Sequence, residues 1–301
     1  MAKPKIGIAL GSGGARGWCH IGALRALAEE GFEPEIVAGC SMGALVGAAY
    51  AAGKLGALEE WALSVNWRKA AAMLDISWGT GGLIDGKRIT AWLKTIHEDA
   101  PIESLAMPFM AIASDLQSGR EVWLHKGSVI DAVRASIAIP GVISPMKLDG
   151  RWLLDGGMTN PVPVSACRAM GAEILIAVNP NAHNLGPNAR PNFGKPAATA
   201  TPSQGFLDKL YDSVSDLVLQ SLKTAMSSTD GPGYFDVLSS SIDIMTSQIL
   251  RSRLAGEPPH VLVSPYLNHI SVLEFDRAKE AIEEGYRATQ QMMPLLREYL
   301  S

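Results

Sequence analysis

The sequence predicts an α/β fold built on a mostly parallel sheet. The first 53 residues hold two successive units of strand, glycine-rich turn and helix, and such units place their strands in parallel with right-handed crossovers. Hydrophobic residues make up 47% of the 301 and charged residues 19%, a charged fraction below the roughly 25% of an average globular chain. The chain can therefore bury a sizeable core around this sheet.

The first unit begins with the apolar run Ile6–Leu10, which enters glycines directly and favours a buried strand. Apolar residues then recur at helical spacing over residues 21–30, and a glycine follows at once as a C-terminal cap. The second unit joins a strand at residues 36–38 to a helix at residues 42–52, which is also closed by a glycine. These four elements predict two parallel strands at the start of the sheet.

Further strand-like runs continue this pattern through the middle of the chain. They lie at residues 109–113, Glu121–Leu124, 152–154 and Ile174–Val178, and a helix is predicted over residues 162–170, before the last of them. This motif-bearing core extends from about residue 5 to residue 180, with no composition break inside it.

The composition changes after residue 180. Residues 183–205 are rich in Pro, Asn, Ala and Gly without apolar periodicity, and a loop of this length is predicted to be mobile or functional. Helices are then expected over residues 206–225, 235–254 and 278–300, with a strand at Val261–Val263. This C-terminal portion, residues 206–301, is predicted to complete a single domain that spans residues 1–301.

Charge and cysteine content exclude several classes of protein. The formal net charge is −4 and no long Lys/Arg block occurs, so an extended nucleic-acid interface is not expected. Three scattered cysteines fit a reducing cytoplasmic setting better than a disulfide framework, and they form no metal-site motif. Residues 36–53 lack charge, but their glycines and central serine favour a buried strand and helix over a membrane span. A peripheral role at a membrane stays open.

The pentapeptide Gly39-Cys40-Ser41-Met42-Gly43 is the first motif that points to chemistry. It has the GxSxG pattern and lies between a predicted strand and a predicted helix. The glycines permit a sharp turn that presents the serine at a helix N-terminus, where oriented N–H groups favour a developing oxyanion. GxSxG alone occurs by chance in chains of this glycine content, so the strand–turn–helix context carries the assignment of Ser41 as a nucleophile.

A second glycine-rich loop, Gly11-Ser12-Gly13-Gly14-Ala15-Arg16-Gly17, follows the first strand directly. Its spacing differs from the GxGxxG pattern of dinucleotide sites. One interpretation is a tight turn without a ligand, and the other is a rim of backbone amides that binds an oxyanion. Parallel strands place such loops at the same edge of the sheet, so this loop and Ser41 are expected to share one crevice.

The base that activates Ser41 is not identified by these patterns alone. Asp155-Gly156-Gly157 ends an apolar strand, although such a sequence is also typical of a turn. A triad would require a histidine, and His183, His260 and His269 are the histidines that follow Asp155, none of them within a motif. The sequence therefore permits a Ser–Asp dyad and leaves a triad open.

These motifs, together with three further ordered segments, resemble the patatin-like phospholipases, and the likeness is closest to small bacterial members related to the neuropathy-target-esterase branch. The resemblance spans roughly residues 5–180. Besides the two glycine-containing loops and Asp155-Gly156-Gly157, it rests on Ser114-Asp115-Leu116-Gln117-Ser118-Gly119, Ala135-Ser136-Ile137-Ala138-Ile139-Pro140-Gly141 and Asn160-Pro161-Val162-Pro163-Val164. It implies a three-layer sandwich, with helices on both faces of the sheet, and metal-free and cofactor-free hydrolysis of lipid acyl esters.

The resemblance also implies the roles of individual residues. Ser41 would be the nucleophile and Asp155 the base, and the amides of Gly13 and Gly14 would bind the oxyanion. The residues assigned with them are Arg16, Ala15, Gly17 and Met42 in the oxyanion hole, and Gly11, Gly39, Gly43, Gly156 and Gly157 as support for the motifs. Cys40 departs from the threonine common at this position, and the likeness beyond residue 180 is too weak to assign an acyl pocket.

The expected substrates are fatty-acyl esters of phospholipids, lysophospholipids or related lipids. An acyltransferase that uses the same serine is an alternative, as is a non-catalytic lipid-binding regulatory protein, although the presence of Ser41 and Asp155 disfavours the latter. Two interpretations of the C-terminal loop and the helix that follows it stay open. One is a disordered surface loop with an ordinary core-facing helix; the other is that both border the acyl pocket and help it meet lipid, or form a homodimer face. The setting is expected to be cytoplasmic, with peripheral membrane contact left open.

Overall fold

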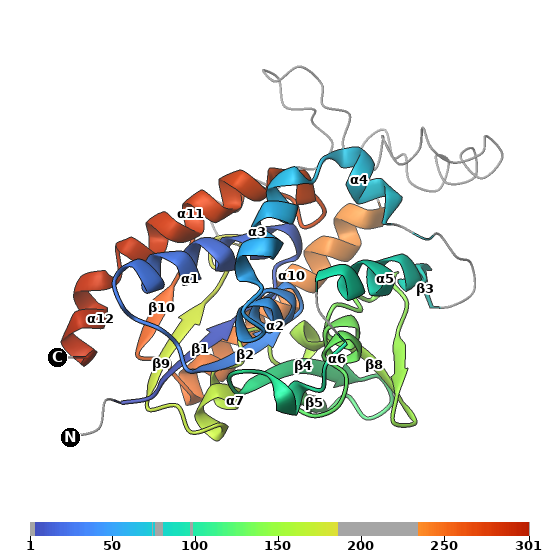
Figure 1. The fold of residues 1–301 in the computed structure, drawn as a ribbon. Helices are drawn as coiled ribbons and strands as arrows, with labels where there is room; N and C mark the ends of the chain where they lie inside the picture. The colour runs from blue at the N-terminus through green and yellow to red at the C-terminus, as the bar shows by residue number, and fades with distance from the viewer. Residues whose placement is uncertain (1–3, 74, 76–80, 97–98, 186–233, 301) are drawn as a thin grey trace, which may run out of the picture.

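An eight-stranded sheet runs through the centre of the protein (Figure 1). The structure, a computed structural model, describes residues 4–73, 75, 81–96, 99–185 and 234–300. Five strands are parallel, in the order β10 (Val261–Val263), β9 (Ile174–Val178), β1 (Ile6–Leu10), β2 (Ile36–Cys40) and β4 (Phe109–Asp115). Three antiparallel strands complete the sheet beside β4, namely β5 (Glu121–Leu124), β8 (Arg151–Asp155) and β7 (Met146–Leu148).

Helices cover both faces of this sheet and form a three-layer sandwich. One layer contains α1 (Cys19–Glu29), α2 (Met42–Ala51), α3 (Leu55–Ser64), α6 (Val129–Ser136) and α11 (Ala278–Gln290); the other contains α7 (Val164–Ala169) and α10 (Tyr234–Gly256). Successive residues of β2 belong to different core clusters, since Val37 packs in the first layer and Ala38 in the second. The predicted α/β sandwich is confirmed.

The remaining elements are short. They are α4 (Trp67–Ala72), α5 (Lys87–Ile96), α12 (Met293–Leu300), the 3-10 helices η1 (Gly14–Trp18), η2 (Ile102–Ser104), η3 (Gly156–Met158) and η4 (Phe275–Arg277), and a two-stranded sheet of β3 (Gly82–Ile84) and β6 (Gly141–Ile143). Within the described residues, every helix is too short or too polar to span a bilayer. The uncharged stretch at residues 36–53 forms β2 and α2 instead.

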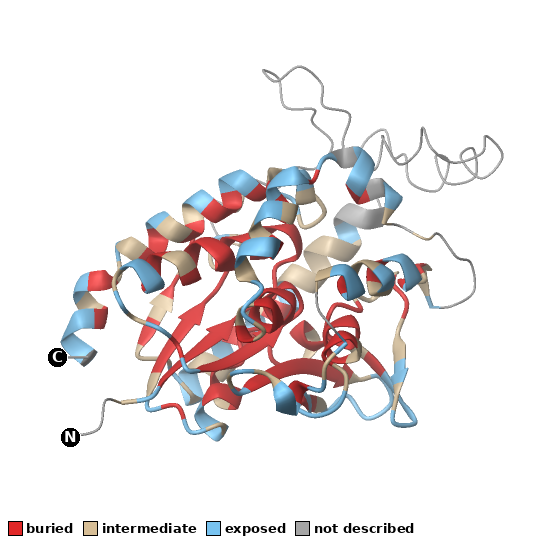
Figure 2. Ribbon diagram, viewed as in Figure 1, coloured by how far each residue is buried: buried red, intermediate tan, exposed pale blue. Residues whose placement is uncertain are grey.

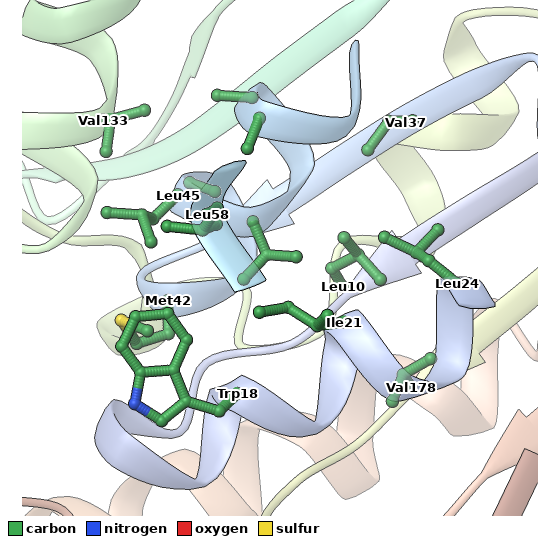
Figure 3. Packing of buried hydrophobic residues seen from close by; sticks show 14 of the residues in the cluster. Leu10, Trp18, Ile21, Leu24, Val37, Met42, Leu45, Leu58, Val133 and Val178 are labelled. Atoms are coloured by element: carbon green, nitrogen blue, oxygen red, sulfur yellow. The ribbon is translucent and has the colours of Figure 1, made fainter. Parts of the chain in front are cut away.

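Burial explains why the central strands lack alternating polar residues. Every residue of β1 and β2 is buried (Figure 2), as expected for parallel strands covered on both faces. On one face Leu10 and Val37 belong to one buried cluster with Trp18, Ile21 and Leu24 of η1 and α1 (Figure 3). Burial of each such side chain contributes about 1.5–3 kcal/mol, so this packing fixes the segment that begins with the glycine-rich loop.

Most elements expected from the sequence are present, and some differ. The structure replaces the single helix predicted over residues 278–300 with α11 and α12, because the chain turns at Gln291 and Met292, just before a proline. The predicted loop at residues 183–205 lies outside the described residues except for its first three, and the helix predicted at 206–225 lies wholly outside them. The strand expected at residues 152–154 is antiparallel β8.

The pairing of β4 brings two distant strand ends together. Residues 111–114 of β4 pair with β5, so β2 and β8 must share the opposite edge of β4. On that edge Cys40 of β2 pairs with Ile112, and Asp155 of β8 pairs with the next residue, Ala113. Because β2 and β8 run toward each other, the residues that follow their ends meet at one point of the sheet.

Candidate active site

Ser41 occupies a sharp turn between β2 and α2. Its backbone has φ 56° and ψ −123°, a conformation that costs a non-glycine residue free energy and that clusters at functional sites. A Cβ at Gly39 would collide with the backbone of Gly43 and Ala44, and a Cβ at Gly43 would collide with Leu10 O. The two motif glycines are therefore required by close backbone approach, and they leave Ser41 at the start of α2 facing a pocket.

Asp155 lies at the end of β8 and faces the same pocket. Its Oδ1 accepts a hydrogen bond from the Gly157 N–H at 2.8 Å, whereas Oδ2 is buried without a hydrogen-bond partner in the described part of the chain. Burial raises the pKa of Asp155 to about 6, and the Ser41 side chain and the Gly157 N–H oppose that shift. Ser41 is thus close enough to affect the pKa of Asp155, although no hydrogen bond of ordinary geometry joins their side chains, which is common before substrate binds.

The other residues of the two motifs pack tightly around this pair. The Cys40 Sγ lies 4.0 Å from Asp155 Oδ1, and burial raises the pKa of the Cys40 thiol, which stays protonated. A Cβ at Gly156 would meet Ile112 O, and a Cβ at Gly157 would lie 3.1 Å from Asp155 Oδ1. A side chain at position 156 would therefore collide with β4, and one at position 157 would crowd the carboxyl group.

The glycine-rich loop supplies N–H groups to the opposite wall of the pocket. The N–H of Ala15 donates to Val272 O at 2.9 Å, and the N–H of Arg16 donates to Gly13 O at 3.2 Å. The N–H groups of Gly13 and Gly14 have no acceptor among the described residues, and both glycines line the pocket with Ser41 and Asp155. N–H groups without an acceptor at the wall of a pocket can stabilise an oxyanion.

The remaining glycines and Met42 lie behind this wall. Met42 is buried and begins α2, and a Cβ at Gly17 would collide with the Met42 side chain. A Cβ at Gly11 would lie 2.8 Å from Val178 O. Gly17, Met42 and Gly11 support the loop and do not line the pocket.

Arg16 is buried beside the loop and is bound on several sides. Its Nε donates to Ile270 O at 2.7 Å, and its Nη1 donates to Asn181 Oδ1 at 2.8 Å and lies 3.7 Å from Asp243 Oδ1. Burial lowers the pKa of Arg16, and the Asp243 carboxylate opposes that shift. Arg16 therefore fixes the loop to the C-terminal half of the chain, including α10.

The pocket above Ser41 has a volume of about 160 Å³. Helix α10 closes one side through Leu238, Ile242 and Asp243, and the segment that carries Val272 closes another. This volume is below the roughly 300–1,000 Å³ of pockets that hold drug-sized ligands. Among the described residues of the C-terminal portion, α10 and the segment around Val272 border the predicted site.

No histidine lines this pocket, as far as the described residues extend. Burial lowers the pKa of His20 to about 4, and its Nε2–H donates to Gly11 O at 2.7 Å. His260 accepts the Leu175 N–H, and His269 pairs with Glu280. His97 lies outside the described residues. The described residues also contain no group of three or more His, Cys, Asp or Glu side chains that could hold a metal ion.

Sequence reasoning assigned no role to two residues that contact the site. Ser136 accepts the Ser41 N–H through its Oγ at 2.8 Å, and Asp243 pairs with Arg16 across the pocket. Ser136 belongs to a motif that carries the family resemblance, which was the available signal. Asp243 lies in a region without such a motif, and only the tertiary structure brings it to the loop.

Comparison with known proteins identifies the family. A sequence model described as patatin-like phospholipase matches residues 8–168. Uncharacterized NTE family proteins of Mycobacterium bovis and Mycobacterium tuberculosis are 35% identical to this chain over 94% of it and 90% of their own length. The human patatin-like phospholipase domain-containing protein 6 is 34% identical, over 58% of this chain and 13% of its own length.

A structural match has also been found to VipD from Legionella pneumophila. It has a TM-score of 0.46 and 14% sequence identity, and covers 99% of this chain and 67% of that one. The family assignment rests on the sequence matches, which include the segment that carries Ser41 and Asp155. The chain belongs to the patatin-like phospholipase family, related to its NTE branch, and is a hydrolase of lipid acyl groups.

Proposed function

We propose that Ser41 and Asp155 form a catalytic dyad that cleaves fatty-acyl esters of phospholipids, lysophospholipids or related lipids. One observation carries this proposal. A serine in a strained turn and a fully buried carboxyl group with an unpartnered oxygen face the same pocket. Strained backbone and a perturbed carboxyl pKa in one cleft are typical of a catalytic site.

In the first half of the reaction Asp155 acts as the general base. Its carboxylate accepts the proton from the Ser41 hydroxyl while Oγ attacks the carbonyl carbon of the ester. The N–H groups of Gly13 and Gly14 stabilise the oxyanion that forms. Collapse of this intermediate breaks the bond to the alcohol oxygen, which takes the proton from Asp155 and leaves an acyl group on Ser41.

The second half of the reaction releases the fatty acid. Asp155 accepts a proton from a water molecule, whose oxygen attacks the acyl carbonyl. The second oxyanion uses the same two N–H groups, and its collapse returns the proton from Asp155 to the Ser41 oxygen. A carboxyl group with a pKa of about 6 suits both steps, because it is ionised near neutral pH and is a stronger base than an exposed aspartate.

The residues that line the pocket favour a lipid acyl chain as the part of the substrate that binds there. Ile139, Val142, Leu238 and Ile242 provide apolar surface beside Ser41. Asn181 and Asp243 add polar groups on the side of the glycine-rich loop. An ester with its acyl chain against the apolar wall would present its carbonyl carbon to Ser41 and its carbonyl oxygen to the loop.

The test compares purified wild type with Ser41→Ala and Asp155→Asn on a panel of phospholipid, lysophospholipid and short soluble esters. Both substitutions should lower kcat/KM by at least about 10³-fold, because each removes a group that takes part in bond making. His260→Ala and His269→Ala serve as controls and should retain most of the activity. An essential histidine together with an active Asp155→Asn variant would replace the dyad with a triad.

A further inference from the structure

The segment that follows α6 contacts the backbone of both proposed catalytic residues. Ser136, the last residue of α6, accepts the Ser41 N–H through its Oγ at 2.8 Å. Two residues later, Ala138 accepts the Asp155 N–H through its carbonyl oxygen at 2.9 Å. The two contacts come from one short stretch of chain, although 95 residues separate Ser41 from Ser136.

Ser136 is itself fixed by a second hydrogen bond. Its hydroxyl donates to Ile112 O of β4 at 2.5 Å, and the whole residue is buried with no exposed surface. Ile112 pairs with Cys40, the residue before Ser41. A Cβ at Gly156 would also collide with the carbonyl oxygen of Ile112. The Ser136 hydroxyl therefore joins β4, the nucleophile turn and the end of α6.

The hydrogen bond to Ser41 has a specific consequence for the turn. Ser41 holds φ and ψ values that its side chain disfavours, and such a conformation persists only where surrounding contacts enforce it. The Ser136 Oγ gives the buried Ser41 N–H its acceptor in this conformation. Because that N–H is occupied, it does not point to the pocket as an oxyanion donor.

We propose that Ser136 is a positioning residue, which holds the Ser41 turn in register with Asp155 through the Ser41 N–H. This inference rests on the proposed Ser–Asp dyad. Ser136 does not line the pocket and so does not touch substrate. Ser136 acts through the backbone of Ser41, so its loss should lower the rate of the chemical step.

The test is Ser136→Ala, which removes the hydroxyl and little volume. We expect kcat for a short soluble ester to fall about 10- to 100-fold with KM within twofold of wild type, since a small misplacement of a reacting group costs rate and not ground-state binding. Covalent labelling of Ser41 by a fluorophosphonate should slow by a similar factor. All rates are expressed per folded molecule, with the folded fraction measured by circular dichroism.

The pH profile separates positioning from a general loss of stability. In wild type the Ser41 side chain lowers the pKa of Asp155 against the effect of burial, so displacement of Ser41 should move the acid limb of kcat/KM to higher pH. Among the described residues, the Cys40 thiol on β2 lies 4.0 Å from Asp155 Oδ1, and Arg16 on η1 and Asp243 on α10 line the same pocket as Asp155; Ser136→Ala alters none of them.

Ser144→Ala is the matched control. Ser144 is also a buried serine, its hydroxyl donates to the strand carbonyl of Ile84 at 3.0 Å, and it does not line the pocket. The Ser144→Ala substitution should lower the melting temperature without a change in the acid limb of kcat/KM or in kcat per folded molecule. If Ser136→Ala does not fold, Ser136→Cys keeps the shape of the side chain with a slightly larger and far weaker acceptor, and it undergoes the same measurements.

The outcomes distinguish this inference from the proposed function. Wild-type kcat per folded molecule and an unshifted acid limb in the Ser136 variant would overturn the positioning role while the dyad stands. An active Ser41→Ala protein would instead overturn the dyad. A lower kcat with unchanged KM and a shifted acid limb, all absent from Ser144→Ala, would support the role of Ser136.

Discussion

Burial changes Asp155 from a weak base into a useful one. An exposed aspartate has a pKa near 3.9, whereas removal of the Asp155 carboxyl from water raises its pKa to about 6. The Gly157 N–H satisfies Oδ1, and Oδ2 stays free to accept a proton. The same burial that raises the pKa of this proposed base also makes its ionised form costly for the folded state.

This pKa predicts an acid limb in the activity profile. The base must be ionised, so kcat/KM should be constant above about pH 7 and should fall as the pH drops through about 6, approaching tenfold per unit below it. Initial rates on a short neutral ester between pH 4.5 and 8.5 measure this fall of kcat/KM with falling pH. Full activity at pH 4.5 would contradict a base with a raised pKa.

The same pKa predicts that Asp155→Asn stabilises the protein as it inactivates it. The folded pKa is above the unfolded value, so ionised Asp155 is disfavoured in the folded state; this penalty is full above about pH 6 and disappears below about pH 4. At pH 8 the variant should gain up to about 3 kcal/mol in the free energy of unfolding. Urea denaturation at pH 8 and at pH 4.5 tests this, and an equal gain at both pH values would contradict it.

At the residue scale, local sequence patterns carried much of the information about the site. Ser41 and Asp155 were proposed from a strand–turn–helix motif and from a family resemblance, and the structure brings them to one pocket. The sequence alone could not exclude a histidine as the base, because the answer depends on which side chains face the pocket. The hydrogen bond from the Ser41 N–H to Ser136, on which the proposed positioning role rests, was also hidden, since a hydrogen bond to a backbone N–H leaves no sequence pattern of its own.

At the element scale, α10 determines the shape of the proposed acyl site. Leu238 and Ile242 face the pocket, whereas Ile244 is 50% exposed on the same helix. Asp243 pairs with Arg16 at one end of the pocket, and Arg253 pairs with Glu121 of β5 at 2.7 Å near the C-terminal end of the helix. The helix is thus fixed over the site at two places.

Substitution of Ile242 by Trp should therefore select against long acyl chains. The larger side chain fills space in a pocket of about 160 Å³, so kcat/KM for a decanoate ester should fall at least about tenfold more than for an acetate ester. Ile244→Trp is the matched control, because it places the same bulk on the exposed side of α10. Equal losses on both esters in the Ile242→Trp protein would mean that the chain binds elsewhere.

Sequence periodicity predicted that α10 exists but not where it packs in the fold. A helix was expected over residues 235–254 from apolar spacing, and α10 spans Tyr234–Gly256. Its contact with the glycine-rich loop depends on residues more than 200 positions apart, and the pairing of Arg16 with Asp243 has no local signal. The antiparallel edge of β7 and β8 was missed for the same reason, since strand direction is set by tertiary pairing.

At the scale of the whole molecule, the two ends of the chain stabilise each other. Helix α11 lies along α1 (Figure 1), and their backbones approach closely at two glycines. A Cβ at Gly22 would collide with Ile282 O, and a Cβ at Gly285 would collide with Cys19 O. Because α1 follows η1, this crossing helps to hold the segment that carries the glycine-rich loop.

The crossing predicts that Gly22→Ala destabilises the fold at a distance from the pocket. The added methyl group forces the helices apart, at a cost of about 1–3 kcal/mol, which lowers the melting temperature by several degrees. Gly56→Ala is the control, since nothing lies within 4 Å of its Cβ and α3 should gain roughly 0.5–1 kcal/mol. Differential scanning calorimetry compares the two, and an unchanged melting temperature in Gly22→Ala would contradict the tight crossing.

In the proposed mechanism, Ser41 forms a covalent acyl intermediate and Asp155 acts as its base. Peptide mass spectrometry after reaction with a fluorophosphonate tests it most directly, because the probe marks the attacking atom without any choice of lipid. We expect one adduct, on the peptide that contains Ser41, which is absent from Ser41→Ala and forms far more slowly in Asp155→Asn. An adduct on another residue of the folded wild type, or an undiminished rate in Asp155→Asn, would contradict it.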